Sequence, residues 1–270
     1  MTEGIRAVDQ IDPETLLAAL AWQVELGVDE AICDEPVDRY SAPPPPEPVA
    51  APIVAAAPTP AQQADKDRTQ AAAQTHALAA SASTLAELRA AMERFDGCAL
   101  KQGARSFVFC DGHPAADLMI IGEAPGKEED REGKPFVGRS GQLLDRMLAA
   151  IGHDRTSQSA QQGAYITNVL PWRPPANRDP SKDEMAMMTP FLLRHITLAQ
   201  PKCILLLGNT AMKTLFQADR GITATRGQWQ QVAGFPAIAS FHPAALLRNG
   251  LHKRSAWEDL LTLKTKLEST

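Results

Sequence analysis

The chain has 270 residues, 44% of them hydrophobic, and a formal net charge of −5, which allows one ordinary domain or two small ones. Its four cysteines are far apart with no CxxC pair, which argues against a disulfide scaffold and against a self-contained zinc site. No stretch reaches the ~18 consecutive apolar residues of a membrane span, and the acidic N-terminus lacks the basic region of a signal peptide. We therefore expect a cytoplasmic protein, in which nothing demands more than a monomer.

Charge is distributed unevenly along the chain. Residues 1–80 carry 4 Lys or Arg against 13 Asp or Glu, a net charge of −9, whereas residues 81–270 carry 23 against 19, a net charge of +4. The negative net charge of the chain therefore comes from residues 1–80, and residues 81–270 are mildly basic. A positive net charge permits contact with a phosphate backbone but does not demand it.

Residues 1–40 form an acidic segment with one predicted amphipathic helix, in which Asp12 is the N-cap and Pro13 the first helical residue. Its apolar side chains share one face: Leu16, Leu17, Leu20 and Val24. The helix either docks on the main domain or tethers a protein partner, and the sequence barely separates the two. Residues 41–82 are rich in proline and alanine and too poor in bulky apolar groups to offset their ordering entropy, so we predict a flexible linker.

The predicted body spans residues 83–270. Four short apolar runs, at residues 117–122, 164–170, 203–208 and 236–241, alternate with helical patterns such as GQLLDRMLAAIG. Strands that alternate with helices predict a parallel sheet covered on both faces. We therefore expect an α/β fold, a three-layer α/β/α sandwich around a central four-stranded parallel sheet.

Chemically suggestive residues follow each of these runs. GEAPG follows the first run, Asn168 lies near the end of the second, GNT follows the third, and HPAALLR follows the fourth. Because the carboxyl ends of parallel strands share one edge of an open sheet, where ligands bind, we expect the four motifs to meet in one cleft.

The loop after the first run combines small residues with negative charge. Gly122 and Gly126 allow the main chain to approach a ligand closely, but the loop lacks the GK[ST] of a phosphate-binding P-loop. Carboxylates such as Glu123 and Glu129 would repel a nucleotide phosphate, which disfavours an NTPase. Phe136, set among glycines and a proline, could present its ring as a flat platform, although a phenylalanine taken alone is more often a core residue.

Two polar side chains complete the predicted cleft. Asn168 offers a hydrogen-bond donor beside an acceptor, which suits the edge of a pyrimidine. His242 could donate a hydrogen bond to developing negative charge. Taken alone, each of these residues more often has a structural role, in a turn or in the core. The prediction of a binding site therefore depends on their combination.

Three motifs in this order resemble the uracil-DNA glycosylase superfamily, and its family-4 branch in particular: IGEAPGKEEDREGKPFVGRSGQLLDRML, YITNVLPWRPPANRDP and HPAALLR. The resemblance covers roughly residues 95–265. It implies a monofunctional DNA N-glycosylase that flips a deoxyuridine out of the stack and hydrolyses its N-glycosidic bond, which starts base excision repair. Uracil-containing DNA would then be the partner.

The resemblance also implies roles for individual residues. Phe136 would stack on the flipped uracil, Asn168 would read its Watson–Crick edge, and His242 would hydrogen-bond uracil O2 as the base leaves. The base pocket would include Gly122, Glu123, Ala124 and Gly126. The DNA would be contacted by Leu246 and Leu247, wedged into the vacated stack, and by Arg248 near a phosphate.

A carboxylate has a use in this chemistry, because the sugar becomes cationic as the bond breaks. The family-1 branch has an aspartate where this chain has Ala124, so that catalyst is absent. The resemblance therefore points to Glu129 for orienting water or stabilising the cation, with Asn177 as its partner.

Family-4 members usually hold a [4Fe–4S] cluster with four cysteines, and of these the resemblance retains only Cys98 here. The other three ligand positions fall on Phe95, Trp172 and Met188. One thiolate cannot hold a cluster. We therefore predict a protein without a cofactor, in which these three side chains form an apolar plug.

Two alternatives stay open. The chain could be a non-catalytic DNA-damage-binding relative, in which loss of the cluster accompanied a lost or changed activity and the N-terminal helix recruits a partner. It could also be a glycosylase for another deaminated or mismatched base, because Gly126 stands where other branches place a methyl-excluding tyrosine. Retention of Glu129, Phe136, Asn168 and His242 favours the enzyme.

Overall fold

The computed structural model of the protein describes residues 12–28 and 72–269. The chain divides into two units, Met1–Ala57 and Pro58–Thr270. In the first unit the described residues form helix α1 (Pro13–Glu25), and the predicted cap is present, because the Asp12 carboxylate accepts from the backbone N–H of Glu14 at 3.0 Å. None of its apolar side chains is buried in the structure.

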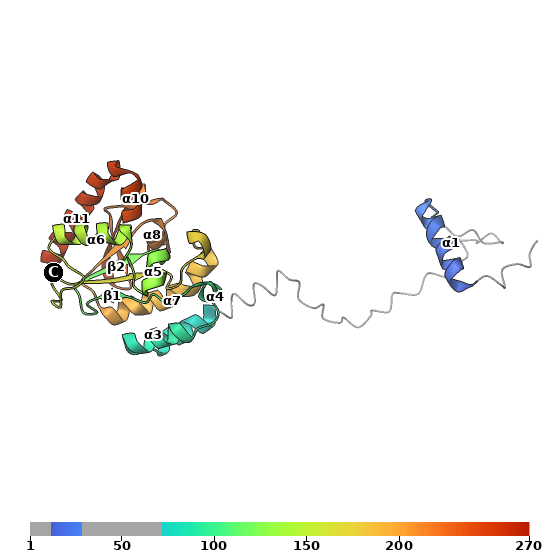
Figure 1. Ribbon diagram of the computed structural model, residues 1–270, viewed down its shortest axis with the longest axis horizontal. Coiled ribbons are helices and arrows are strands. Elements are labelled where there is room, and N and C mark those ends of the chain that lie inside the picture. The colour runs from blue at the N-terminus through green and yellow to red at the C-terminus, as the bar shows by residue number, and fades with distance from the viewer. Residues whose placement is uncertain (1–11, 29–71, 270) are drawn as a thin grey trace, which may run out of the picture. The chain divides into compact units, whose positions relative to one another are not determined.

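A mixed six-stranded sheet forms the centre of the second unit, in the order β1-β3-β2-β4-β6-β5 (Figure 1). The four central strands are parallel: β2 (Leu118–Gly122), β3 (Ala164–Asn168), β4 (Cys203–Leu207) and β6 (Phe235–Ser240). The predicted four-stranded parallel sheet is therefore confirmed. The prediction missed two antiparallel edge strands, β1 (Asp111–Gly112) and β5 (Trp229–Val232).

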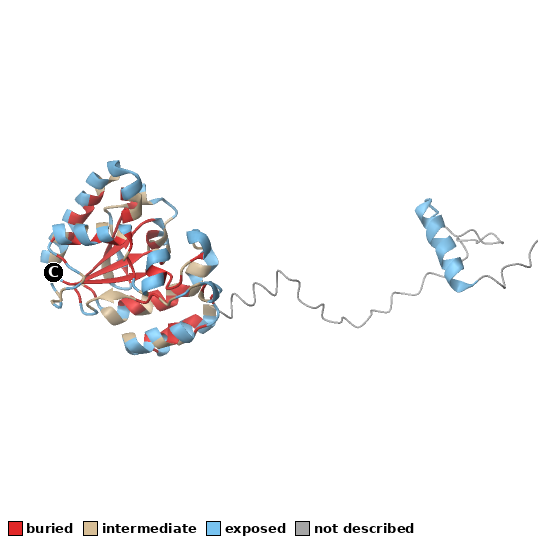
Figure 2. Cartoon of the chain, viewed as in Figure 1, coloured by how far each residue is buried: buried red, intermediate tan, exposed pale blue. Residues whose placement is uncertain are grey.

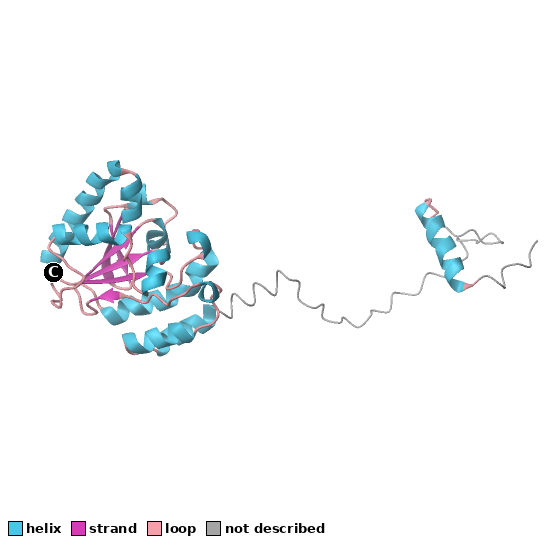
Figure 3. Cartoon of the chain, viewed as in Figure 1, coloured by secondary structure: helices cyan, strands magenta, loops and turns pink. Residues whose placement is uncertain are grey.

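Helices cover both faces of the sheet, as predicted for a three-layer α/β/α sandwich (Figure 3). Core side chains of α3 (Leu85–Arg94), α7 (Lys182–Ala199) and α8 (Asn209–Phe216) pack with one set of strand residues. Those of α6 (Arg139–Ala150) and α11 (Lys253–Glu268) pack with the alternate set. Other helical elements are α4 (Leu100–Gly103), α5 (Lys127–Glu132), η1 (Pro175–Asn177), α9 (Ile222–Thr225), α10 (Pro243–Arg248) and η2 (Gly250–His252).

Burial on both faces explains the continuous apolar runs. In β2, Met119 and Ile121 belong to the core beneath α3 and α7, whereas Leu118 and Ile120 belong to the core beneath α6 and α11. Successive side chains of a strand point to opposite faces, so a strand covered on both sides needs an apolar residue at every position. Figure 2 shows the resulting buried sheet.

The predicted linker extends too far toward the C-terminus. Residues 72–81 are helical, and the side chains of Thr75, Ala79 and Ala82 are buried. The Ala82 carbonyl accepts from the Arg194 guanidinium of α7 at 2.7 and 2.9 Å. These residues therefore belong to the body, and they resemble a linker only because small alanines allow close packing without bulky side chains. The rest of the predicted linker, residues 41–71, lies outside the described residues.

No helix within residues 12–28 and 72–269 combines the length and the apolar character needed to cross a membrane.

Candidate active site

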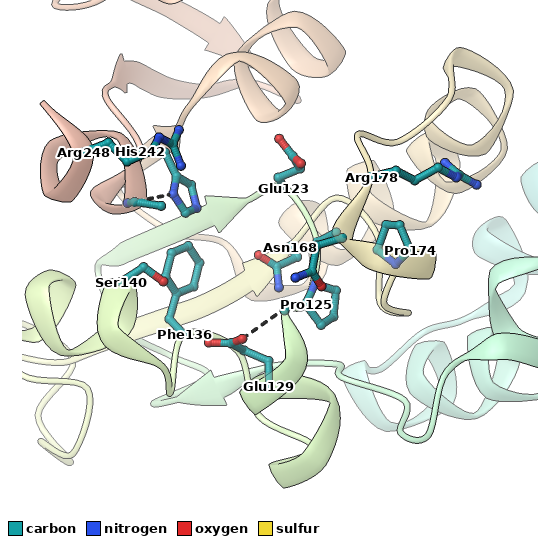
Figure 4. Close-up of a pocket in the computed structure, with 14 residues that line it drawn as sticks. Glu123, Pro125, Glu129, Phe136, Ser140, Asn168, Pro174, Arg178, His242 and Arg248 are labelled. Carbon is teal, nitrogen blue, oxygen red and sulfur yellow. Dashed lines mark hydrogen bonds between the residues drawn. The ribbon is translucent and has the colours of Figure 1, made fainter.

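A cavity of about 300 Å³ opens at the carboxyl ends of the parallel strands. Nine of the predicted site residues line it: Glu123, Ala124, Gly126, Glu129, Phe136, Asn168, Asn177, His242 and Arg248. Five further lining residues were not among the predicted site residues: Pro125, Ser140, Pro174, Arg178 and Ala244. Figure 4 shows that side chains from the segments that follow β2, β3 and β6, and from the loop of Phe136, surround this space. Three of the four strand-exit motifs therefore meet in one cavity, as expected from the parallel topology. The fourth motif, GNT, instead lines a neighbouring hollow together with Glu123 and His242.

Gly122 brings two of the predicted base-binding side chains together. It is paired with Asn168 at the ends of β2 and β3. A Cβ atom at residue 122 would lie 2.4 Å from Oδ1 of Asn168 and 2.5 Å from Cζ of Phe136. Any side chain at this position would push both groups away, so the close approach itself requires glycine.

Phe136 is placed as a wall of the cavity. Its side chain is 5% exposed and belongs to the core between the sheet and α6. Its ring centroid lies 5.4 Å from that of His242, with 28° between the ring planes. The core interpretation is confirmed, because the ring packs in this core. Phe136 also lines the cavity, and its use as a stacking platform stays a prediction.

His242 is held in one tautomer. It precedes α10, and its Nδ1 accepts a hydrogen bond from the backbone N–H of Ala244 at 3.1 Å (Figure 4). Burial, together with the positive charge of Arg248, lowers the pKa of His242 to about 4. At neutral pH the imidazole is therefore uncharged, and its proton is on Nε2, which can donate a hydrogen bond.

The Glu129 carboxylate is buried and largely saturated with hydrogen bonds. Its Oε2 accepts from the backbone N–H of Gly126 at 3.1 Å. Its Oε1 accepts from the backbone N–H groups of Val137 and Gly138 at 3.0 and 2.9 Å. A carboxylate has about four lone-pair positions, so about one remains for a water molecule or substrate. None of these three contacts was predicted from the sequence, and two of them join residues eight and nine positions apart.

The other polar groups have partners of their own. Thr210, in the GNT motif at the start of α8, donates to Oε2 of Glu123 at 2.5 Å. The carboxamide oxygen of Asn177 accepts from Nε of Arg173 at 2.7 Å. Asn177 lines the same cavity as Glu129, and a catalytic pairing of the two stays a prediction.

The two leucines after His242 differ in exposure. Leu246 is 2% exposed and packs with Phe241 and Ala256 in a small core cluster. Leu247 is 41% exposed and lines a neighbouring hollow of about 630 Å³ together with Arg248. Leu246 is therefore a core residue, and Leu247 is the exposed leucine of the pair. Four cations line this hollow: Lys127, Arg131, Arg139 and Arg248.

The positions of the family-4 cluster ligands are filled with apolar side chains. Phe95, Trp172 and Met188 are 2%, 3% and 0% exposed and belong to one core cluster together with the buried thiol of Cys98. The Phe95 ring packs edge-on against Phe191 with centroids 5.7 Å apart. Within the part of the chain that the structure describes, no group of three or more His, Cys, Asp or Glu side chains could hold a metal ion. The residues present do not fit a [4Fe–4S] cluster, which needs four thiolates.

The fold and the cavity define a class of protein: an α/β sandwich whose cavity at the carboxyl ends of the strands is lined by an aromatic side chain, a carboxamide and an imidazole. The sequence matches the Uracil DNA glycosylase superfamily over residues 109–261. The chain therefore belongs to the uracil DNA glycosylase superfamily.

Several relatives share much of this sequence. A Type-4 uracil-DNA glycosylase of Sulfurisphaera tokodaii is 37% identical over 179 residues, which cover 62% of this chain and 77% of the relative. A Type-4 uracil-DNA glycosylase of Thermotoga maritima is 35% identical over 180 residues, which cover 64% of this chain and 90% of the relative. These relatives confirm the predicted resemblance to the family-4 branch.

Proposed function

We propose that this protein is a monofunctional uracil-DNA glycosylase, which hydrolyses the N-glycosidic bond of deoxyuridine in DNA and starts base excision repair. The observation that supports this most directly is the convergence of Phe136, Asn168 and His242 on one cavity. The similarity to Type-4 uracil-DNA glycosylases adds support, since it extends over at least 76% of five relatives. The target nucleotide leaves the stack and enters the cavity, because the bond is out of reach inside a duplex.

The base is recognised by stacking and by one carboxamide. Phe136 stacks on the ring, and Asn168 pairs with its Watson–Crick edge, where uracil has an O4 acceptor beside an N3 donor. Cytosine has a donor beside an acceptor instead, and each unmatched buried group costs ~1–3 kcal/mol. Glu123, held by Thr210, forms part of the pocket wall. The site therefore selects uracil by the direction of its hydrogen bonds.

His242 stabilises the leaving base. As the bond breaks, uracil takes the bonding electron pair and becomes an anion, and the Nε2–H of His242 donates a hydrogen bond to its O2. The tautomer fixed by Ala244 and the pKa of about 4 keep this imidazole neutral and its proton in place. One such donor contributes about 10²–10³ in rate.

Glu129 acts on the sugar side of the reaction. Departure of the base leaves positive charge on the sugar, and a water molecule adds to its anomeric carbon. The proton that this water loses neutralises the uracil anion, so that the products are free uracil and a sugar hydroxyl. The three backbone hydrogen bonds of Glu129 fix its charge in place, which suits electrostatic stabilisation of the cation. Its remaining lone pair can orient the water, with Asn177 beside it.

The surroundings of the cavity contact DNA. Leu247, half-exposed beside Arg248, inserts into the space that the flipped base leaves, while buried Leu246 supports it from within. Arg248 contacts a phosphate. The exposed apolar side chains of α1 bind a protein partner.

The enzyme works without a cofactor, because Phe95, Trp172 and Met188 form an apolar plug where a cluster would need thiolates. The described cysteines, Cys98, Cys110 and Cys203, are free thiols, which fits a reducing compartment that contains DNA, the cytoplasm.

The test is an excision assay in the presence of EDTA. Single- and double-stranded oligonucleotides carry uracil, cytosine, mismatched thymine or hypoxanthine, and abasic sites are detected by alkaline strand cleavage. We expect cleavage at uracil, none at cytosine, and no effect of EDTA. The oligonucleotides with thymine and hypoxanthine test the pocket beside Gly126, because a glycine has no side chain of its own to exclude a larger base. Intact DNA binding without cleavage of any substrate would overturn the proposal in favour of a non-catalytic damage-binding protein.

A further inference from the structure

The loop that carries Phe136 has an unfavourable backbone conformation. Phe136 has a φ of 53°, in the left-handed region, which is unfavourable for a residue with a Cβ atom. Such a conformation persists only where the surrounding structure over-determines it. The chain must therefore contain groups that hold this loop in place.

An anion holds the loop on its C-terminal side. Oε1 of Glu129 accepts from the backbone N–H groups of Val137 and Gly138, the two residues that follow Phe136. The same carboxylate accepts from Gly126 through Oε2. Glu129 thus ties the loop after β2 to the loop of Phe136.

A cation holds the loop on its N-terminal side. Nη1 of Arg155 donates to the carbonyl of Pro135 at 3.0 Å, and Nη2 donates to the carbonyl of Phe136 at 2.9 Å. The planar guanidinium can reach two acceptors at once, which a lysine ammonium on its flexible stem cannot do in the same fixed geometry.

Arg155 is itself fixed by two carboxylates. Its side chain is 10% exposed and lies 2.7 Å from Oδ1 of Asp145 in α6 and 3.3 Å from Oδ2 of Asp111 in β1. Desolvation of a guanidinium is costly unless it is paired. The two ion pairs therefore keep Arg155 beneath the loop, although it does not line the cavity.

We propose that Arg155 is a positioning residue of the base pocket. It holds the carbonyl groups of Pro135 and Phe136 and thereby keeps the Phe136 ring in the orientation that stacks on a flipped base. The catalytic consequence of this inference rests on the proposed glycosylase function, whereas the structural consequence does not. Because Arg155 acts only through the loop, its removal should have little effect once the Phe136 ring is gone.

The kinetic test is a double-mutant cycle with Arg155→Gln, Phe136→Ala and the combined variant. We expect Arg155→Gln to lower the single-turnover excision rate by about tenfold or more, since small misplacements of binding groups are costly, and to leave the Kd for uracil-free DNA unchanged. The combined variant should lose little beyond Phe136→Ala. Arg155→Lys, which keeps the charge, should show an intermediate rate and serves if Arg155→Gln fails to fold.

The matched control is Arg194→Gln, because Arg194 also donates two hydrogen bonds to a backbone carbonyl but does so on the opposite face of the sheet. It should keep the wild-type rate. Multiplicative losses in the combined variant would overturn the positioning role.

A second measurement needs no activity. Hydrogen exchange of the Val137 and Gly138 amides should accelerate in Arg155→Gln and not in Arg194→Gln. Unchanged exchange would overturn the inference. Faster exchange in a protein whose wild type excises no uracil would instead refute the glycosylase proposal and leave the positioning role intact.

Discussion

A single methyl group at residue 122 should disable the base pocket. In Gly122→Ala the new Cβ atom would lie 2.4 Å from Oδ1 of Asn168 and 2.5 and 2.6 Å from two ring carbons of Phe136, where ordinary contact begins at 3.4 Å. Both groups must therefore move by about 1 Å, a displacement that costs about 10²-fold in rate. This corresponds to ~2.7 kcal/mol of transition-state stabilisation.

The cost to stability should be smaller than the cost to activity. Overpacking of a core costs typically ~1–3 kcal/mol, so the variant should fold with a lowered Tm. We would measure kcat/KM on a uracil-containing oligonucleotide well below that Tm. The control is Gly103→Ala, where an added methyl group has no heavy atom within 4 Å and activity should not change. Wild-type kcat/KM in folded Gly122→Ala would refute the claim that Asn168 and Phe136 read the base together.

Three further outcomes are expected. The free energy of unfolding should fall as the pH drops from about 6.5 toward 4. In the folded protein, burial lowers the pKa values of His195 and His242 to about 3 and about 4, so in this pH range the unfolded chain binds protons that the folded chain does not. A urea midpoint that does not change with pH would contradict this. Trp172→Ala should destabilise the fold by ~3–5 kcal/mol, measured by urea denaturation. Leu247→Ala should slow excision with little effect on Tm, whereas Leu246→Ala should mainly lower Tm, and equal effects on both would argue against the wedge.

Much of the architecture was predictable because it depends on local pattern. Strands buried on both faces must be apolar at every position, and the four runs carry this pattern without reference to the rest of the chain. The edge strand β5 (Trp229–Val232) does not, since its two central glutamines are exposed. The helical residues 72–81 were missed for a related reason, because buried Ala79 and Ala82 have the composition of a linker.

The site was predictable to the extent that topology determines it. Parallel strands place their carboxyl ends at one edge, so Asn168 and His242 had to approach the loop of Phe136. Topology does not determine which hydrogen bonds and packing contacts fix each of these side chains. The hydrogen bond from Thr210 to Glu123 and the burial of Leu246 beside exposed Leu247 depend on packing details that no motif records.

The sequence by itself therefore determined the four parallel strands, the position of the cleft at their carboxyl ends and nine of the residues that line it. Only the tertiary structure decided how those groups are held: Glu129 by three backbone amides, and the Phe136 loop by Arg155. The physical reason is that hydrophobic periodicity is a local property of the chain. A hydrogen bond between residues nineteen positions apart exists only after the sheet and its helices have brought them together.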